Sequence, residues 1–282
     1  MQDGRRGESG MKISLITACF NSAATIRTAM ESVFAQRGVD VEYIVVDGGS
    51  TDGTIEIIRE YEQTRNSNSQ RTTPDITFRW LSESDKGMYD AINKGIKMAT
   101  GDVVGILNAD DVLEGEETLK HVVDCFNRAE TCRDGKMGNG VDAVYADVRF
   151  VKDDLETTVR YYSAKHWKPW MHNWGYMPPH PSVYVRRELF GKFGGYKLGY
   201  CISADFELMV RYLCRNRIKA VYMPECVVKM RMGGKSTKNW RANVLLNVEN
   251  VRANRENGYI SCFAMMLPKY LFKIWGFVFK RG

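Results

Sequence analysis

Acidic residues follow three apolar segments of the chain, in positions where carboxylates could read a nucleotide and hold a cation. Asp47, Asp85 and the pair Asp110–Asp111 each come after one of these segments. Closely spaced carboxylates can coordinate Mg²⁺ or Mn²⁺ while the ion keeps open positions for phosphate oxygens. Aspartate is also a common cap and turn residue at strand ends, so one such group alone would carry little weight. Three groups converging on one edge of a sheet favour a polar ligand site.

The elements that would bring these residues together alternate between strands and helices. Short apolar segments predict strands at residues 12–17, 41–47, 76–81 and 102–107. Apolar residues spaced three and four apart predict helices between them, over 26–34, 54–61 and 88–99, with Asn21 or Ser22 as the first N-cap. This alternation predicts βαβ units and a mainly parallel sheet with both faces covered. Ligands of such sheets bind outside the carboxyl ends of the strands.

The pattern changes after the fourth predicted strand. Helical spacing returns, a hairpin is predicted, and a Gly-rich loop and a Pro- and aromatic-rich segment separate these elements. The helices are expected over 118–128, 205–214 and 240–255, the loop over 132–140, the hairpin strands over 143–151 and 157–163, and the Pro-rich segment from 178. Asn257–Gly258 is a suitable C-cap for the last helix.

Two glycine-rich motifs lack the spacing of common nucleotide-binding fingerprints. The segment Asp47-Gly-Gly-Ser-Thr-Asp-Gly-Thr54 permits close backbone approach, but it has no G-x-G-x-x-G pattern. Gly233-Gly-Lys-Ser236 has neither the first glycine nor the strand-to-helix context of a P-loop. The sequence therefore indicates neither a dinucleotide fingerprint nor a P-loop.

Seven stretches of the chain resemble family 2 glycosyltransferases with the GT-A fold, particularly the cytoplasmic enzymes that build bacterial surface polysaccharides. They occur in the family's order, and they are Ile16-Thr-Ala-Cys-Phe-Asn21, Val45-Val-Asp-Gly-Gly-Ser-Thr-Asp-Gly-Thr54, Ser84-Asp-Lys-Gly-Met-Tyr-Asp-Ala-Ile-Asn93, Gly101-Asp102, Leu107-Asn-Ala-Asp-Asp111, His180-Pro-Ser182 and Ser203-Ala-Asp-Phe-Glu-Leu208. The resemblance implies a Rossmann-like α/β/α sandwich with a mainly parallel central sheet and a C-terminal helical extension. It identifies the donor sugar poorly.

The resemblance also implies roles for individual residues. Thr17 and Asp47 would lie at the nucleoside base, and Asp85 near the base or ribose. Asp110 would be the metal-binding carboxylate of the D-x-D motif, and Asp205 would stand where the family places its catalytic base. The expected cofactor is Mn²⁺ or Mg²⁺, and the expected donor is a UDP-, GDP- or dTDP-sugar.

The chain departs from the family pattern at two places. The first acidic position of D-x-D is Asn108, whose amide can still hydrogen-bond a ribose but supplies no charge. The usual Glu-Asp pair at the base position is Ala204-Asp205, which leaves one carboxylate. The expected reaction is a single in-line displacement with inversion. A cation on Asp110 would neutralise the diphosphate, and Asp205 would take the proton of the acceptor hydroxyl.

Histidines and tryptophans leave two interpretations open. His180 lies between two prolines, where it could meet the diphosphate or acceptor or could be a structural histidine in a tight turn. His166 and His172 stand among Trp167, Trp170 and Trp174, which could line an acceptor groove. A small satellite core has the same composition, and we prefer that interpretation.

The formal net charge of +6 hides an asymmetry. Residues 208–282 contain 15 Lys and Arg against 3 Asp and Glu, whereas residues 1–207 contain 25 against 31. An acidic body without a basic stripe argues against a nucleic-acid binder. Residues 259–279 are apolar but interrupted by Pro268, Lys269 and Lys273, which favours an interfacial segment over a spanning helix. A helix packed on the body or in a dimer interface is the alternative, so a homo-oligomer is also considered.

We therefore expect a flexible leader (1–10), a GT-A domain (11–225) and a basic, amphipathic C-terminal extension (226–282). The expected location is the cytoplasmic face of the plasma membrane, where the protein would meet a saccharide or lipid-linked acceptor. Seven cysteines without a C-x-x-C pair fit a reducing compartment. A catalytically inactive nucleotide-sugar sensor or scaffold is one alternative. A nucleotidyltransferase is another, which the loop Ala18–Asn21 after the first strand argues against.

Overall fold

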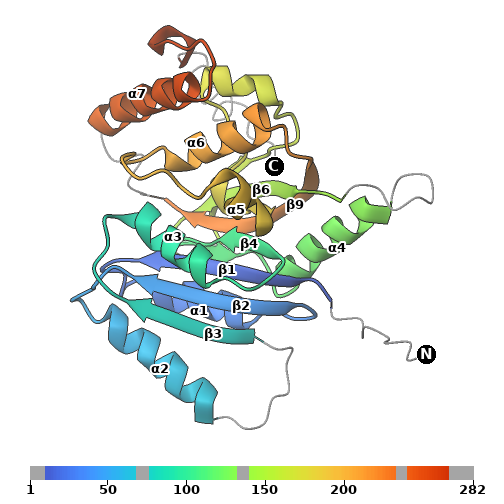
Figure 1. The fold of residues 1–282 in the computed structure, drawn as a ribbon. Helices are drawn as coiled ribbons and strands as arrows, with labels where there is room; N and C mark the ends of the chain where they lie inside the picture. The colour runs from blue at the N-terminus through green and yellow to red at the C-terminus, as the bar shows by residue number, and fades with distance from the viewer. Residues whose placement is uncertain (1–9, 68–75, 132–139, 233–239, 267–282) are drawn as a thin grey trace.

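The computed structural model describes residues 10–67, 76–131, 140–232 and 240–266 (Figure 1). Within these residues, the strands form one nine-stranded sheet in the order β3-β2-β1-β4-β8-β6-β9-β5, with β7 paired to β6 outside this path. The strands are β1 (Lys12–Cys19), β2 (Asp40–Asp47), β3 (Ile76–Ser82), β4 (Val103–Ile106), β5 (Val112–Leu113), β6 (Ala143–Val151), β7 (Thr158–Tyr162), β8 (Val183–Arg186) and β9 (Ala220–Arg231).

The sheet has a parallel half and a mixed half. β1 pairs in parallel with β2 and β4, and β2 pairs in parallel with β3. This half agrees with the expected parallel sheet. Beyond β4 the sheet is mixed, because β8 is antiparallel to both β4 and β6 while β9 is parallel to β6. The antiparallel hairpin of β6 and β7 is confirmed.

Helices cover both faces of the sheet, so the expected α/β/α sandwich is confirmed (Figure 1). On one face, α1, α2 and α4 pack against apolar residues of the strands. On the other face, α3, α5, α6 and α7 contribute to a second core. The α-helices are α1 (Ile26–Phe34), α2 (Thr54–Ser67), α3 (Met88–Met98), α4 (Thr118–Thr131), α5 (Glu188–Phe193), α6 (Ala204–Met209) and α7 (Trp240–Glu256). Short 3-10 helices are η1 (Pro169–Trp174), η2 (His180–Ser182) and η4 (Phe263–Met266).

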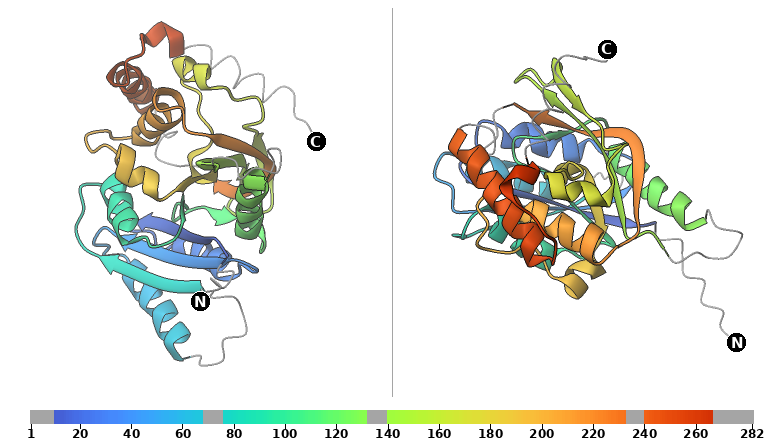
Figure 2. Two further views of the ribbon diagram at one scale, coloured as in Figure 1. Left: turned by 45° about the vertical axis from the view of Figure 1, so that its right-hand side comes forward. Right: turned by 90° about the horizontal axis from the view of Figure 1, so that it is seen from above.

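The helix predicted over 205–214 is present, but it changes type halfway. α6 continues directly into a π-helical segment, η3 (Val210–Arg215). Both parts are buried in the second core. α7 lies alongside them, as the two views of Figure 2 show.

The last helix, α7, turns polar residues towards the protein and apolar residues outwards. Its buried residues include one carboxylate and several amides: Asn247, Glu249, Asn250 and Asn254. Val244, Leu245 and Val248 are exposed instead. Hydrogen bonds therefore make a large part of the contact between α7 and the body. The predicted C-cap is confirmed, because Gly258 has φ 88° and its N–H donates to the Arg255 carbonyl.

Several sequence predictions need correction. The N-cap expected at Asn21 or Ser22 is wrong, because Ser22–Thr25 form a turn and α1 begins at Ile26. The domain boundary expected after residue 225 falls inside β9, which pairs with β6 on both sides of that position. The GT-A sheet therefore continues to Arg231. Strands β5, β8 and β9 were not predicted. Most of the leader, the Gly-rich loop and the C-terminal segment lies outside the described residues.

Candidate active site

The loop after β2 is organised by one buried carboxylate. Asp47 Oδ2 accepts hydrogen bonds from the N–H groups of Gly49 and Ser50, both at 3.0 Å, and from Ser82 Oγ at 2.7 Å. Its Oδ1 accepts from Ser50 Oγ. Burial alone would raise the pKa of Asp47, but these hydrogen bonds outweigh it and lower the pKa. The side chain therefore stays ionised, and its two oxygens are used in hydrogen bonds with the loop and with Ser82.

The roles expected for Asp47 and Thr17 at the nucleoside base stay predictions. Both side chains are fully buried in this structure. The Thr17 hydroxyl accepts a hydrogen bond from the Tyr43 hydroxyl at 3.1 Å, inside the core between β1 and β2. Asp47 shapes the loop whose backbone would meet a nucleotide. The contacts of both side chains are with the protein itself: Asp47 with the loop after β2, and Thr17 with Tyr43.

Asp85 lies beside this loop and is only half-buried. Its Oδ1 accepts from the Gly87 N–H at 2.7 Å. The other oxygen, Oδ2, lies where a side chain at position 48 would begin, because a Cβ built on Gly48 would be 2.5 Å from it. Asp85 is thus the accessible carboxylate of the predicted nucleotide-binding set.

The Asn108–Asp111 loop connects the end of β4 to β5. Asn108 Nδ2 donates to Asp111 Oδ2 at 2.8 Å, and the Arg231 N–H donates to Asp111 Oδ1 at 3.2 Å. Asp111 is buried, and burial together with the charge of Asp110 raises its pKa to about 8. Asp110 remains half-buried. Asp111 therefore joins this loop to the end of β9, and Asp110 is the carboxylate that can reach a ligand.

These residues fit a cation that takes most of its ligands from the substrate. In the part of the chain that the structure describes, no three His, Cys, Asp or Glu side chains are grouped to hold a metal. Asp110 supplies one carboxylate. The side-chain Nδ2 of Asn108 donates to Asp111, so the side-chain oxygen Oδ1 of Asn108 remains available to a cation. Mg²⁺ is commonly held by one or two carboxylates together with phosphate oxygens and water. Asp110, with Asn108 beside it, would hold such an ion, which would supply positive charge against a diphosphate.

Asp205 is the second residue of α6 and is half-buried. Its Oδ1 accepts from the Phe206 N–H at 2.8 Å and lies 3.3 Å from the Tyr89 hydroxyl. Burial raises the pKa of Asp205. The protonated form of His180 and these hydrogen bonds act in the opposite direction, and they offset only part of the increase in this pKa. A carboxylate with a raised pKa is better suited to accept a proton near neutral pH.

His180 is buried and belongs to the surroundings of Asp205. Its Nε2 lies 2.5 Å from the Tyr196 hydroxyl, and the Tyr196 ring stacks on Tyr89 with 5.7 Å between centroids. Burial lowers the pKa of His180, which favours the neutral imidazole at pH 7. The structural interpretation of this histidine therefore has direct support, and its contact with a substrate stays a prediction.

The topology of the sheet places several predicted site residues on neighbouring elements. η2, which begins at His180, leads into β8 and lies against β4, the strand that precedes Asn108 and Asp110. Tyr89, near the start of α3 and four residues after Asp85, donates to the Ile202 carbonyl, just before Asp205. The start of α3 is thereby linked to the N-terminus of α6.

The aromatic segment before His180 packs on the core in part. Trp167 packs against the second core and meets Tyr145 edge-on, with 5.7 Å between ring centroids. His172 is buried, and its Nδ1 lies 2.8 Å from Asn254 Oδ1. Trp170 is 52% exposed, and His166 is exposed as well. The satellite-core interpretation therefore holds for Trp167 and His172.

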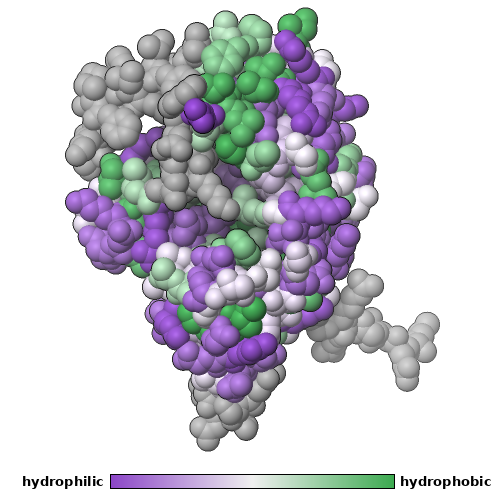
Figure 3. Space-filling model, turned by 90° about the vertical axis from the view of Figure 1, so that its left-hand side faces the viewer, coloured by the Kyte–Doolittle hydropathy of each residue, from purple (hydrophilic) through white to green (hydrophobic). Residues whose placement is uncertain are grey.

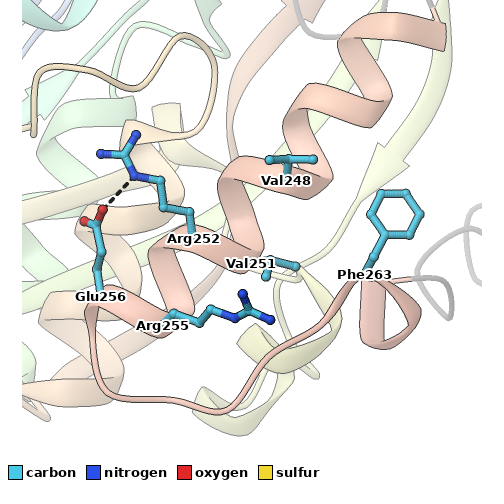
Figure 4. A pocket seen from close by; sticks show the side chains of 6 residues that line it. All are labelled: Val248, Val251, Arg252, Arg255, Glu256 and Phe263. Atoms are coloured by element: carbon cyan, nitrogen blue, oxygen red, sulfur yellow. Dashed lines mark hydrogen bonds and ion pairs between the residues drawn. The ribbon is translucent and has the colours of Figure 1, made fainter.

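A groove of about 420 Å³ lies on the outer side of α7, away from the strand ends (Figure 4). Its polar groups are already paired: Arg252 Nε donates to Glu256 Oε1 at 2.6 Å, and Arg255 Nε donates to the Ser261 carbonyl at 2.9 Å. Val248 and Phe263 supply much of its apolar wall (Figure 4). We assign no chemistry to it.

Three residues of the site were missed from the sequence. Tyr89 stands inside a recognised motif, so attention to aromatic residues beside the acidic ones could have found it. Tyr196 carries no such signal. Glu249 belongs to a stripe of polar residues at helical spacing in α7, a pattern that indicates a buried polar face when the other side of the helix is apolar.

Two solved structures share the fold of this chain. A mannosyltransferase from Pyrobaculum calidifontis, in complex with GDP-Man and Mn²⁺, aligns with a TM-score of 0.62 at 18% identity, covering 96% of this chain and 73% of that one. Residues 1–349 of S. aureus TarS, in complex with UDP-GlcNAc, align with a TM-score of 0.58 at 17% identity, covering 86% of this chain and 68% of that one. The chain spans 44% of a longer TarS chain. The fold is therefore GT-A.

The sequence comparisons define the family. The model of glycosyl transferase family 2 matches residues 14–193, more than half of the chain, and the chain belongs to this family. A PGL/p-HBAD biosynthesis glycosyltransferase of Mycobacterium bovis is 29% identical over 212 residues, covering 74% of this chain and 73% of the relative. The chain is thus a glycosyltransferase with neighbours that bind nucleotide sugars. None of the helices in the described residues has both the length and the apolar character needed to span a bilayer.

Proposed function

We propose that this glycosyltransferase moves a sugar from a nucleotide diphosphate sugar to an acceptor hydroxyl in one displacement, with inversion at the sugar carbon. Asp205 would take the proton from the hydroxyl as it attacks. Asp85 and the loop shaped by Asp47 would hold the nucleoside. Asp110, with Asn108 beside it, would hold a divalent cation against the diphosphate.

The observation that carries this proposal is the state of Asp205. It is a half-buried carboxylate with a raised pKa, and Tyr89 ties it to the turn that carries Asp85. Asp47 and Asp111 are buried and hydrogen-bonded within the protein, and Asp85 and Asp110 are proposed to bind the nucleotide and the cation, so Asp205 is the carboxylate proposed as the base. A single carboxylate supports direct displacement, since a covalent intermediate would need a second group to serve as nucleophile.

Asp205→Asn tests the role of the base. The substitution keeps the shape of the side chain and removes its ability to accept a proton, so transfer should fall at least about 100-fold. Binding of the nucleotide, measured by calorimetry, should stay within about twofold. Turnover close to that of the unmodified enzyme would refute the assignment.

The donor class can be narrowed by ligand-dependent melting. The solved neighbours bind UDP-GlcNAc or GDP-Man, so UDP-, GDP- and dTDP-sugars are the natural candidates. Each would be added with Mn²⁺, because a ligand that binds only the native state raises the melting temperature. Release of free nucleoside diphosphate during incubation with an acceptor would separate an active transferase from an inactive nucleotide-sugar sensor.

The acceptor is proposed to be a saccharide, in the first place a lipid-linked one met at the cytoplasmic face of the membrane during polysaccharide synthesis. The support is the basic last quarter of the chain together with exposed apolar residues at its described end: Val248 of α7 is 51% exposed, and Phe263 of η4 is 44% exposed. Figure 3 shows hydrophobic residues gathered at the upper end of one face of the molecule. Flotation with vesicles of anionic lipid tests this contact. Recovery of the protein in the bottom fraction, with vesicles at the top, would refute it.

A further inference from the structure

The carboxylate of Glu249 receives hydrogen bonds from three consecutive backbone N–H groups. Its Oε1 accepts from Cys201 at 2.7 Å, and its Oε2 accepts from Ile202 and Ser203, both at 2.9 Å. Glu249 is 5% exposed and belongs to the buried polar face of α7. Hydrogen bonds from N–H groups to an ionised carboxylate are short and strong, so the segment 201–203 is firmly attached to α7.

This segment needs an acceptor from elsewhere in the fold. It precedes α6, and within the described residues Ser203 makes no side-chain cap to that helix. The Ser203 hydroxyl instead donates to the Leu246 carbonyl of α7 at 3.5 Å. Buried backbone N–H groups without a partner cost free energy, and Glu249 supplies the acceptor for these three.

The segment held by Glu249 leads directly to the candidate base. Ser203 stands two residues before Asp205, and α6 has only six residues before it changes into the π-helical segment η3. A helix this short has little stability of its own, so contacts with the rest of the protein determine its position. Tyr89 holds the other side of the same segment, because its hydroxyl donates to the Ile202 carbonyl.

We propose that Glu249 is a positioning residue for the transfer reaction: by holding residues 201–203 it sets the place from which Asp205 reaches the acceptor hydroxyl. The inference rests on the proposed function of Asp205. Glu249 lies in α7, outside residues 14–193, the part matched by the family model. If Glu249 has this role, α7 contributes to catalysis as well as to packing. Small errors in the position of a reacting group are costly, and a displacement of about 1 Å can cost about 100-fold in rate.

Glu249→Gln in the full chain is the direct test. Glutamine has the same shape as glutamate. Its side-chain NH₂ group would take the place of one carboxylate oxygen, so at least one backbone N–H of residues 201–203 would face a donor instead of an acceptor. We expect kcat to fall at least 10-fold. The KM for the donor should stay within twofold, and so should the melting shift caused by the nucleotide, because the donor site lies on other elements.

Glu256→Gln is the matched control. Glu256 lies two turns further along α7, where it pairs with Lys197 and with Arg252, the second pair being visible in Figure 4. Among the described residues, the hydrogen bonds from Lys197 Nζ and Arg252 Nε to its carboxylate involve none of residues 201–203. Its kcat should stay within twofold of the unmodified enzyme. Both variants are assayed at least 15 °C below their melting temperatures, so that a loss of stability alone does not change kcat.

The outcomes separate this inference from the proposed function. An unchanged kcat in Glu249→Gln, with Asp205→Asn inactive, would overturn the positioning role and leave the base in place. Normal turnover in Asp205→Asn would overturn both. If Glu249→Gln does not fold, Glu249→Asp keeps the charge but draws the carboxylate back from the segment. It should then show a reduced kcat with unchanged donor KM, and full activity would contradict the inference.

Discussion

The carboxylate of Asp85 fills the space left by the missing side chain of Gly48. A Cβ at position 48 would lie 2.5 Å from Asp85 Oδ2, closer than any normal contact. Glycine is therefore needed at position 48 so that the side chain of Asp85, which follows β3, can take its place. Its own backbone conformation is not among those with positive φ.

Gly48→Ala should weaken nucleotide binding while leaving the protein folded. The new methyl group would push the half-exposed carboxylate of Asp85 away from its present position. Losing one hydrogen bond to a charged group costs about 1.5 kcal/mol or more, so we expect about 10-fold weaker binding. Calorimetry with the nucleoside diphosphate measures this directly.

Gly191→Ala serves as the control for that variant. No atom lies within 4 Å of a Cβ built there, and Gly191 is inside α5. Alanine should leave nucleotide binding unchanged and stabilise the helix slightly. Equal affinity in Gly48→Ala and the unmodified enzyme would mean that Asp85 does not contact the nucleotide.

Asp110→Asn should remove the response to a divalent cation. We expect that Mn²⁺ no longer increases the melting shift produced by the nucleoside diphosphate, because the accessible carboxylate of this loop is gone. Asp111→Asn is the matched variant, since Asp111 is buried and faces Asn108 and Arg231. It should lower the free energy of unfolding by about 1 kcal/mol through a lost hydrogen bond and keep the Mn²⁺ response. The opposite pattern would assign the metal to Asp111.

Tyr89→Phe should shift the pH dependence of transfer. The raised pKa of Asp205 predicts that kcat falls as the pH drops through that pKa, because the protonated acid cannot act as a base. The hydrogen bond from Tyr89 lowers this pKa, so its removal should move the acid limb to higher pH. We also expect kcat at neutral pH to fall by about 10-fold, roughly the worth of a hydrogen bond to a charged group.

Tyr184→Phe is the control for that measurement. The hydroxyl of buried Tyr184 has no hydrogen-bond partner among the described residues. Its removal should leave the pH profile unchanged and should not reduce the melting temperature. An acid limb that is the same in Tyr89→Phe and in the unmodified enzyme would mean that another group controls it.

The first half of the fold could be predicted from the sequence because its elements carry strong patterns. β1 to β4 are nearly continuous apolar segments, and α3 has apolar residues at helical spacing. β5, β8 and β9 could not be predicted in the same way. β5 has two residues and β8 has four, and β9 carries Pro224 in its middle, so their pairing depends on distant parts of the chain.

The candidate site could be predicted in composition but not in the direction of its side chains. A polar residue at a strand end can face a ligand or satisfy the loop backbone, and the sequence does not distinguish the two. Asp47 satisfies the loop backbone, because five donors surround its carboxylate. Asp85 and Asp110 are half-buried. The polar stripe of α7 indicates that Glu249 is buried, but its partners could not be predicted because they are backbone groups.

β9 has a neighbour on each side, β6 and β5, although it lies beyond the part of the chain that defines the family. A fragment ending at residue 193 would leave one edge of β6 without its parallel partner. Open strand edges pair readily with other chains, so such a fragment should aggregate instead of folding into a smaller enzyme. The shortest soluble form of this glycosyltransferase is therefore expected to include the segment from Ala220 to Arg231.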